Sequence, residues 1–215
     1  MFATAKNCFC PLKSVISCAS ISESQIRYSR AQNKQSIAME IGEKFIEFTL
    51  KGADGKMHNI YEYADKYALC IVFTSNSCPY SKAYGQRLIK LLAKYEDDNF
   101  GIIGINSNDA SKSPQDSFEE MKRISEKLGL ESINFMYLQD EDQSIAKAYG
   151  AKVNPEVFLF NSKRELVYKG AIDDNWQSPA LVTRVFLEDA IEYCLDGIEV
   201  DFPEIEAEGC PIIWK

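Results

Sequence analysis

One stretch of the chain, Ala68–Phe73, is apolar at every position. A strand with one face in water alternates apolar and polar residues, so this run predicts a central strand with both faces covered. Phe100–Asn106 indicates a second buried strand. From residue 45 onward, short β-branched runs alternate with segments at helical spacing. This order predicts an α/β fold in which helices flank a central mixed β-sheet.

Apolar spacing and turn residues predict the remaining elements. Further strands are expected over residues 45–50 and 135–138, and a β-hairpin is expected from 157–160 with 166–169. Helices are expected from Cys78-Pro79 to about residue 97, from Ser113-Pro114 to near Gly129, over 142–149, and from Ser178-Pro179 to Gly197.

Charge divides the chain near Met39. Residues 1–38 carry five basic residues and one acidic residue, whereas the whole chain has 24 basic and 32 acidic residues. An organellar transit peptide has this Ser/Arg-rich, acid-poor composition, and a start codon assigned too early explains it equally well. We expect a disordered extension over 1–38, one domain over 39–198 and an acidic tail over 199–215. The protein is then cytoplasmic, or organellar if the extension is a transit peptide.

Composition excludes several classes of function. The net charge of −8 argues against binding to nucleic-acid phosphates. The longest uninterrupted apolar run, 68–73, is far shorter than the ~18 residues of a membrane span. With His58 as the one histidine, neither a zinc site nor a Cys–His pair is expected, and we expect no metal or cofactor. Seven cysteines in a chain of 215 residues do not make a disulfide scaffold, and they suit a reducing compartment.

Cys78 is the candidate nucleophile. It follows the buried strand after a polar loop and directly precedes Pro79, a residue favoured in the first turn of a helix. Unpaired N–H groups and the positive end of the helix dipole stabilise an anion there, so we expect the thiolate form of Cys78 to be favoured. Cys70, in the apolar run, and Cys194, in the last expected helix, are instead predicted to be inert buried thiols.

Eight segments carry motifs in a fixed order: 73–81, 104–110, Pro114 with 116–117, 138–141, 146–151, 155–160, 168–174, and Gly209 with Cys210. Together they resemble the peroxiredoxin-like redoxin proteins of the thioredoxin superfamily, which are related to the alkyl hydroperoxide reductase and thiol-specific antioxidant family. The resemblance covers about residues 39–215. It implies a thioredoxin-like fold with an inserted βα extension.

The resemblance implies a thiol-dependent oxidoreductase or antioxidant in which Cys78 reacts with disulfides or peroxides. Its partners would be a protein disulfide or peroxide substrate and a thiol reductant, either thioredoxin or glutathione. Pro155 resembles the cis-proline that packs beside the thiol in such folds. The substrate-binding residues that the resemblance implies are Pro79, Tyr80, Ser81, Asn154 and Pro155. Asp173 and Asp174 follow a strand and fit either a proton acceptor of the site or a solvated turn.

The active-site turn departs from the family pattern. The C-x-x-C of thioredoxins is here Cys78-Pro79-Tyr80-Ser81, so the usual second thiol is a serine. The cysteine of the peroxiredoxin Thr-x-x-Cys motif aligns with Ser81, and Ser75-x-x-Cys78 matches that motif only in a shifted register. A two-thiol cycle within this turn is therefore impossible, and the shifted register argues against peroxiredoxin catalysis.

A second thiol would have to come from elsewhere in the chain. Cys210 lies in the tail between Gly209 and Pro211, and a mobile tail that returned to the active site would make it the resolving thiol. Two alternatives stay open. One is a glutathione-linked reaction of Cys78 alone, and the other is a redox-silent thioredoxin-like binding module.

Overall fold

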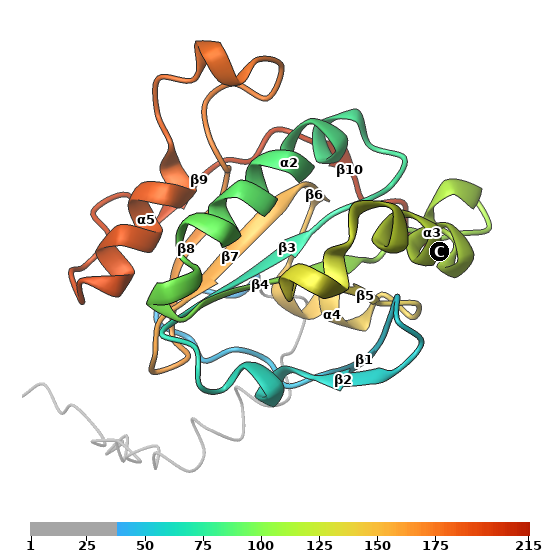
Figure 1. The fold of residues 1–215 in the computed structure, drawn as a ribbon, viewed down its shortest axis with the longest axis horizontal. Coiled ribbons are helices and arrows are strands. Elements are labelled where there is room, and N and C mark those ends of the chain that lie inside the picture. Colours follow the sequence, from blue (N-terminus) through green and yellow to red (C-terminus); the bar gives the residue numbers. More distant parts are fainter. Residues whose placement is uncertain (1–37) are drawn as a thin grey trace, which may run out of the picture. The chain divides into compact units, whose positions relative to one another are not determined.

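The computed structural model describes residues 38–215, and Figure 1 shows their arrangement. The extension expected over residues 1–38 lies outside the described residues, apart from Ala38. Within 38–215, no helix is long and apolar enough to cross a membrane.

An eight-stranded mixed sheet forms the centre of the described chain, with strand order β2-β1-β5-β4-β3-β7-β8-β9. Its strands are β1 (Thr49–Gly52), β2 (Met57–Asn59), β3 (Ala68–Phe73), β4 (Phe100–Asn106), β5 (Met136–Gln139), β7 (Glu156–Phe160), β8 (Leu166–Gly170) and β9 (Glu204–Ile205). The central strand β3 runs parallel to β4 and antiparallel to β7. A separate two-stranded sheet pairs β6 (Val153–Asn154) with β10 (Cys210–Pro211).

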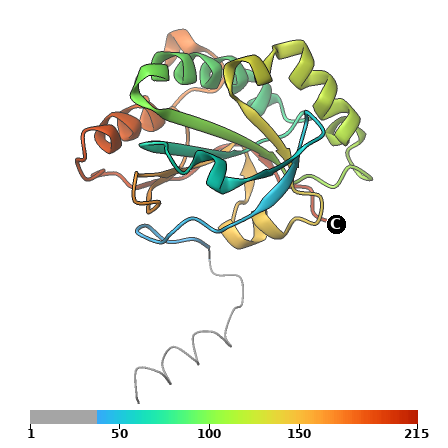
Figure 2. The ribbon, with the colours of Figure 1, turned by 60° about the horizontal axis from the view of Figure 1, so that its bottom comes forward.

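Helices cover both faces of the large sheet. They are α2 (Pro79–Lys94), α3 (Phe118–Leu128), α4 (Ser144–Tyr149) and α5 (Phe186–Leu195). One core cluster joins residues of α2, α3 and α5 to Cys70 and Val72 of β3, and the other joins α4 to Ile71 and Phe73. Figure 2 shows α4 on the opposite side of the sheet from the other three helices. Every residue of β3 is buried, which confirms the central strand with both faces covered.

The strands β3 and β4 have the bounds that the sequence predicts, but the last helix does not. Pro179 opens only the 3₁₀ turn η5 (Pro179–Leu181), and α5 begins at Phe186. The preceding loop is held by its own hydrogen bonds, because the Asp174 carboxylate accepts bonds from the amide and the hydroxyl of Thr183. The expected helix start at Ser178-Pro179 is therefore wrong.

Residues 199–215 return to the body of the molecule. β9 pairs in parallel with β8 at one edge of the large sheet, and β10 pairs with β6. Ile212 is buried in the core cluster that contains α4, and the carbonyl of Ile213 accepts a hydrogen bond of 2.8 Å from the Asp109 amide. In the structure this segment is anchored along its length, in contrast to the mobile tail expected from the sequence.

Candidate functional site

Cys78 is the N-cap residue of α2, at the junction that leads from β3 into this helix. Pro79 begins the helix, as expected from its fixed φ and missing N–H. The Cys78 thiol is 2% exposed and donates to the Asn154 carbonyl over 2.9 Å, and it makes no cap hydrogen bond to the first turn of α2. The expected cradle of helix amides around this sulfur is therefore wrong for the thiol, because its proton bonds a carbonyl on another loop.

That carbonyl belongs to the loop 153–156. The Asn154–Pro155 bond is cis, as the resemblance implied, and both residues are buried. The Glu156 carboxylate accepts a hydrogen bond from the Lys152 amide over 2.7 Å and a longer one from the amide of Val153. This segment, called here the prolyl loop, thus has its own internal support.

Cys210 lies in β10, which pairs with this loop. In the register of β10 with β6, Cys210 is the partner of Asn154, the residue whose carbonyl binds the Cys78 thiol. Burial, together with hydrogen bonding to Cys78 and the charge of that neighbour, raises the pKa of the Cys210 thiol to about 12, although a hydrogen bond from the Tyr80 amide acts in the opposite direction. Both cysteines are free thiols. The structure therefore brings Cys78 and Cys210 together across Asn154.

Aromatic and acidic side chains hold the tail next to the prolyl loop. The Tyr80 ring packs on the Trp176 ring with 4.2 Å between centroids, and the Tyr80 hydroxyl donates to Glu208 over 3.0 Å. A Cβ atom at Gly209 would lie 2.4 Å from the Asn154 carbonyl oxygen, so only glycine allows the tail to approach the prolyl loop this closely.

The other residues of the predicted turn have different surroundings. Pro79 is exposed. Ser81 is buried on α2, where its hydroxyl oxygen accepts a hydrogen bond of 3.3 Å from the Ser75 amide. Ser81 thus supports the loop before Cys78, and its hydroxyl is engaged with the protein's own backbone.

A buried carboxylate lies beneath the loop that carries Cys78. Asp116, at the end of the 3₁₀ turn η3 (Pro114–Asp116), is 1% exposed. Six donors reach it over 2.6–3.0 Å: the hydroxyls of Ser75, Ser77 and Ser113, the side-chain amides of Asn106 and Asn108, and the backbone amide of Asn76. Burial acts to raise the pKa of Asp116, but these hydrogen bonds outweigh it and the pKa is lowered. Asp116 is therefore held as an anion.

In the sequence, Asp116 stands out only as part of a motif. A signal was present, because polar residues follow both β3 and β4, and the carboxyl ends of neighbouring parallel strands meet at one edge of a sheet. Hydroxyl and amide donors gathered at such an edge require an acceptor. The acceptor itself comes from a turn ten residues after β4, which no spacing rule identifies.

The two acidic residues after β8 are engaged in structural contacts. Asp173 pairs with the Arg87 guanidinium over 2.6 Å and accepts a hydrogen bond of 2.8 Å from the Tyr84 hydroxyl. Asp174 bonds Thr183. These contacts favour the structural interpretation of the pair over a proton acceptor.

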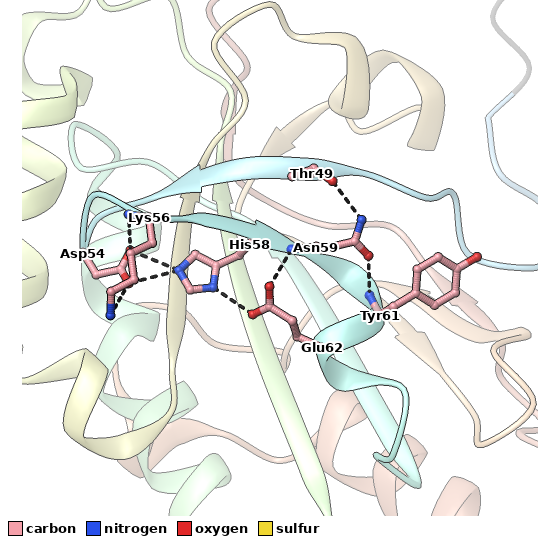
Figure 3. A network of polar contacts seen from close by, with 7 residues as sticks. All are labelled: Thr49, Asp54, Lys56, His58, Asn59, Tyr61 and Glu62. Carbon is pink, nitrogen blue, oxygen red and sulfur yellow. Dashed lines mark hydrogen bonds and ion pairs between the residues drawn. The ribbon is translucent and has the colours of Figure 1, made fainter.

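His58 lies in a separate polar network on the hairpin of β1 and β2, shown in Figure 3. Its Nδ1 is 2.9 Å from Glu62 and its Nε2 is 3.0 Å from Asp54. Burial acts to lower the pKa of His58, but the two carboxylates outweigh it and the pKa is raised. Because both ring nitrogens are engaged, His58 is not an acid–base partner of Cys78.

Of the two other described cysteines, one lies in the core and the other packs against it. Cys70 is fully buried in β3, and burial raises the pKa of its thiol. Burial also raises the pKa of Cys194, in α5, to about 11. Neither thiol has the setting of a nucleophile.

Comparison with known proteins places this chain in a family. The model of the AhpC/TSA family matches residues 41–169. A crystal structure of a hypothetical protein from Sinorhizobium meliloti is 33% identical, with a TM-score of 0.76 over 84% of this chain and 97% of that one. An uncharacterized conserved protein from Geobacillus kaustophilus is also 33% identical, with a TM-score of 0.73 over 82% of this chain and 93% of that one.

A more distant structure shares the fold. Peroxidoxin BcpB from Mycobacterium tuberculosis is 12% identical, with a TM-score of 0.51 over 74% of this chain and 95% of that one. Among curated proteins, no match was found. The family match over more than half of the chain, together with the thioredoxin-like arrangement of the sheet and helices, confirms the resemblance seen in the sequence. The chain is a redoxin of the thioredoxin superfamily and belongs to the AhpC/TSA family.

Proposed function

We propose that Cys78 and Cys210 form a two-thiol redox centre that exchanges with disulfides of other molecules. The observation that carries this proposal is that the Asn154 carbonyl binds the Cys78 thiol while Asn154 is also the strand partner of Cys210. A redox function in general follows from the family. The pairing of these two cysteines is the specific part of the proposal.

The reaction proceeds in two exchanges. The Cys78 thiolate attacks one sulfur of a substrate disulfide, whose S–S bond breaks, and the departing thiolate takes up a proton. The Cys210 thiolate then attacks Cys78 in the mixed disulfide and releases the second substrate thiol. The product is a Cys78–Cys210 disulfide, which two thiols of an external reductant, thioredoxin or glutathione, return to the dithiol. With a peroxide, the Cys78 thiolate attacks one peroxide oxygen, the O–O bond breaks, and an alcohol or water leaves after taking up a proton. Cys210 then condenses with the Cys78 sulfenic acid to the same disulfide and water.

The position of the second thiol supports this reading over a monothiol cycle. In the usual C-x-x-C turn the second thiol comes from the same helix, whereas here that position is Ser81. Cys210 is the strand partner of Asn154, whose carbonyl binds the Cys78 thiol, so the second thiol comes from the tail and not from α2. The tail thus supplies the second thiol, which the turn lacks.

Peptide mapping tests the proposal. The full chain is equilibrated with mixtures of reduced and oxidised glutathione, quenched with acid, alkylated and digested. We expect the Cys78–Cys210 crosslinked peptide to form first, while Cys70 and Cys194 remain reduced. In Cys210→Ser, a mixed disulfide of Cys78 with glutathione should accumulate instead. A wild-type chain in which Cys78 and Cys210 stay reduced in oxidised glutathione and in peroxide would overturn the proposal.

One observation favours a different function. Cys78 is 2% exposed, which suits a redox-silent module that binds a partner without reacting. Iodoacetamide labelling of the native chain separates the redox centre from the binding module. The redox centre requires Cys78 to be labelled in the folded chain well before Cys70, whereas a binding module would leave both thiols unlabelled until the chain unfolds.

A further inference from the structure

The loop before Cys78 donates its hydrogen bonds to an acceptor from another part of the chain, the Asp116 carboxylate. Residues 75–77 send three donors to Asp116, the Ser75 hydroxyl, the Asn76 amide and the Ser77 hydroxyl. The Asn76 amide bond is the shortest of these at 2.6 Å. Because each of the three residues before Cys78 is tied to one carboxylate, the direction in which the chain enters Cys78 depends on Asp116.

Asn108 links Asp116 to the other two parts of the site, the prolyl loop and the tail. Its side-chain amide donates to Asp116 over 3.0 Å, and its side-chain oxygen accepts from the Asn154 side chain over 3.2 Å. That oxygen also accepts a hydrogen bond of 3.0 Å from the Ile213 amide in the tail. Asp116 and Asn108 together therefore bond the thiol loop, the prolyl loop and the segment that carries Cys210.

The donors around Asp116 are all neutral. Hydrogen bonds to a charged group contribute more than neutral ones, and a buried network of this kind restricts its members to one arrangement. A hydrophobic residue of similar size would satisfy none of the six donors. The loop geometry thus depends on an anion rather than on packing.

We propose that Asp116 is the positioning residue of the thiol centre, holding Cys78 in the orientation from which it forms a disulfide with Cys210. This inference rests on the proposed function. The relevant equilibrium is Cys78–SH + Cys210–SH + GSSG forming Cys78–S–S–Cys210 + 2 GSH, in which glutathione disulfide is reduced as the protein is oxidised. Its equilibrium constant measures how well the two thiols are held together.

The first test is Asp116→Asn, which keeps the shape of the side chain and removes its charge and one acceptor. We expect the glutathione equilibrium constant of the Cys78–Cys210 pair to fall about tenfold, the equivalent of about one strong hydrogen bond. A merely structural role would lower the stability of the chain and leave this constant unchanged. An unchanged constant in a folded Asp116→Asn protein would overturn the inference.

A matched pair of variants keeps the test decisive if Asp116→Asn does not fold. The hydroxyls of Ser77 and Ser113 each donate over 2.7 Å to the same Asp116 oxygen, but Ser77 adjoins Cys78 and Ser113 lies in the turn of Asp116 itself. Ser77→Ala should lower the constant about threefold, and Ser113→Ala should change it by less than about 1.5-fold, although each loses one charged hydrogen bond. Equal effects of the two variants would contradict positioning.

The outcomes also separate this inference from the function on which it rests. If the wild-type chain forms no Cys78–Cys210 disulfide, the proposed function fails and the inference fails with it. If the wild-type disulfide forms and neither Asp116→Asn nor Ser77→Ala shifts its equilibrium, the redox centre stands and Asp116 has no positioning role.

Discussion

Two polar regions of this molecule are organised in opposite ways. In the hairpin network of Figure 3, Asp54, His58 and Glu62 bond one another across four residues of sequence. In the thiol site, Cys78 bonds a residue 76 positions away, and Asp116 bonds Ser75 across 41 positions. The hairpin uses a titratable base between two acids, whereas the thiol site uses one acid among neutral donors. A local network stabilises its own hairpin, and a long-range one determines how distant segments meet.

The largest expected effect is on the rate of disulfide reduction, which should depend on the thiol site and not on the hairpin network. Cys78→Ser should lower the rate at which the chain reduces a small disulfide by at least about 100-fold, because an alcohol at this position cannot replace the thiolate nucleophile. His58→Gln, in the hairpin, should remain within about twofold of wild type in the same assay. A Cys78→Ser protein with the wild-type rate would show that the chemistry lies elsewhere.

A second comparison removes the acid at the centre of each network. Asp116→Ala should reduce the free energy of unfolding by about 3–5 kcal/mol, because six buried donors lose their acceptor. Asp54→Ala should cost about 1 kcal/mol, since fewer groups lose their partner and one of them, the Lys56 ammonium, is exposed. Urea denaturation at pH 7 measures both losses. Equal losses would mean that the sequence separation between the bonded residues does not determine how much a network contributes to the free energy of unfolding.

The contact between the tail and the prolyl loop gives an intermediate effect. Gly209→Ala places a methyl group against the Asn154 carbonyl and should destabilise the chain by about 1–3 kcal/mol while moving β10 away from β6. Alkylation of Cys78 should then accelerate about tenfold, since the strand that covers it is displaced. Gly85→Ala is the matched control, because a Cβ atom on that residue of α2 meets nothing within 4 Å. Similar alkylation rates in the two variants would argue against the tail as a cover.

The smallest expected effect concerns pH. The pKa of His58 is raised in the folded chain, so its contribution to stability is complete below the unfolded value of about 6.5 and is lost as pH rises through the folded pKa. The pKa of Asp116 is lowered, so its contribution is lost only as pH falls below about 4. Between pH 6 and 9, the stability difference between wild type and His58→Gln should shrink, by less than about 1 kcal/mol. A difference that grows with pH would reverse the assigned shift.

The sequence predicts most of the sheet because a buried strand leaves few alternatives. An apolar run of six residues fits only the centre of a covered sheet, and β3 and β4 have the expected bounds. The two-residue strands β6, β9 and β10 are too short to show any periodicity, so their pairing could not be predicted. Ser178-Pro179 has the signature of a helix start, but the turn it opens ends after three residues.

The sequence predicts which residues form the site but not the contacts that orient them. The position of Cys78 before Pro79 and the cis-proline both follow from local sequence or family motifs. The direction of the thiol does not, because its acceptor is the carbonyl of Asn154, a backbone atom that carries no sequence signature. The role of Asp116 could not be predicted from the sequence for a similar reason. Its role depends on donors from two strand ends and a turn that meet only in the folded chain.

The strand β10 also has a consequence for biosynthesis. It is the last strand of the described chain, so Cys78 and the prolyl loop leave the ribosome well before Cys210. Domains generally fold as units. The site that joins Cys78 to Cys210 is therefore complete only after the residues of β10 have left the ribosome, and until then the edge of β6 lacks its partner strand.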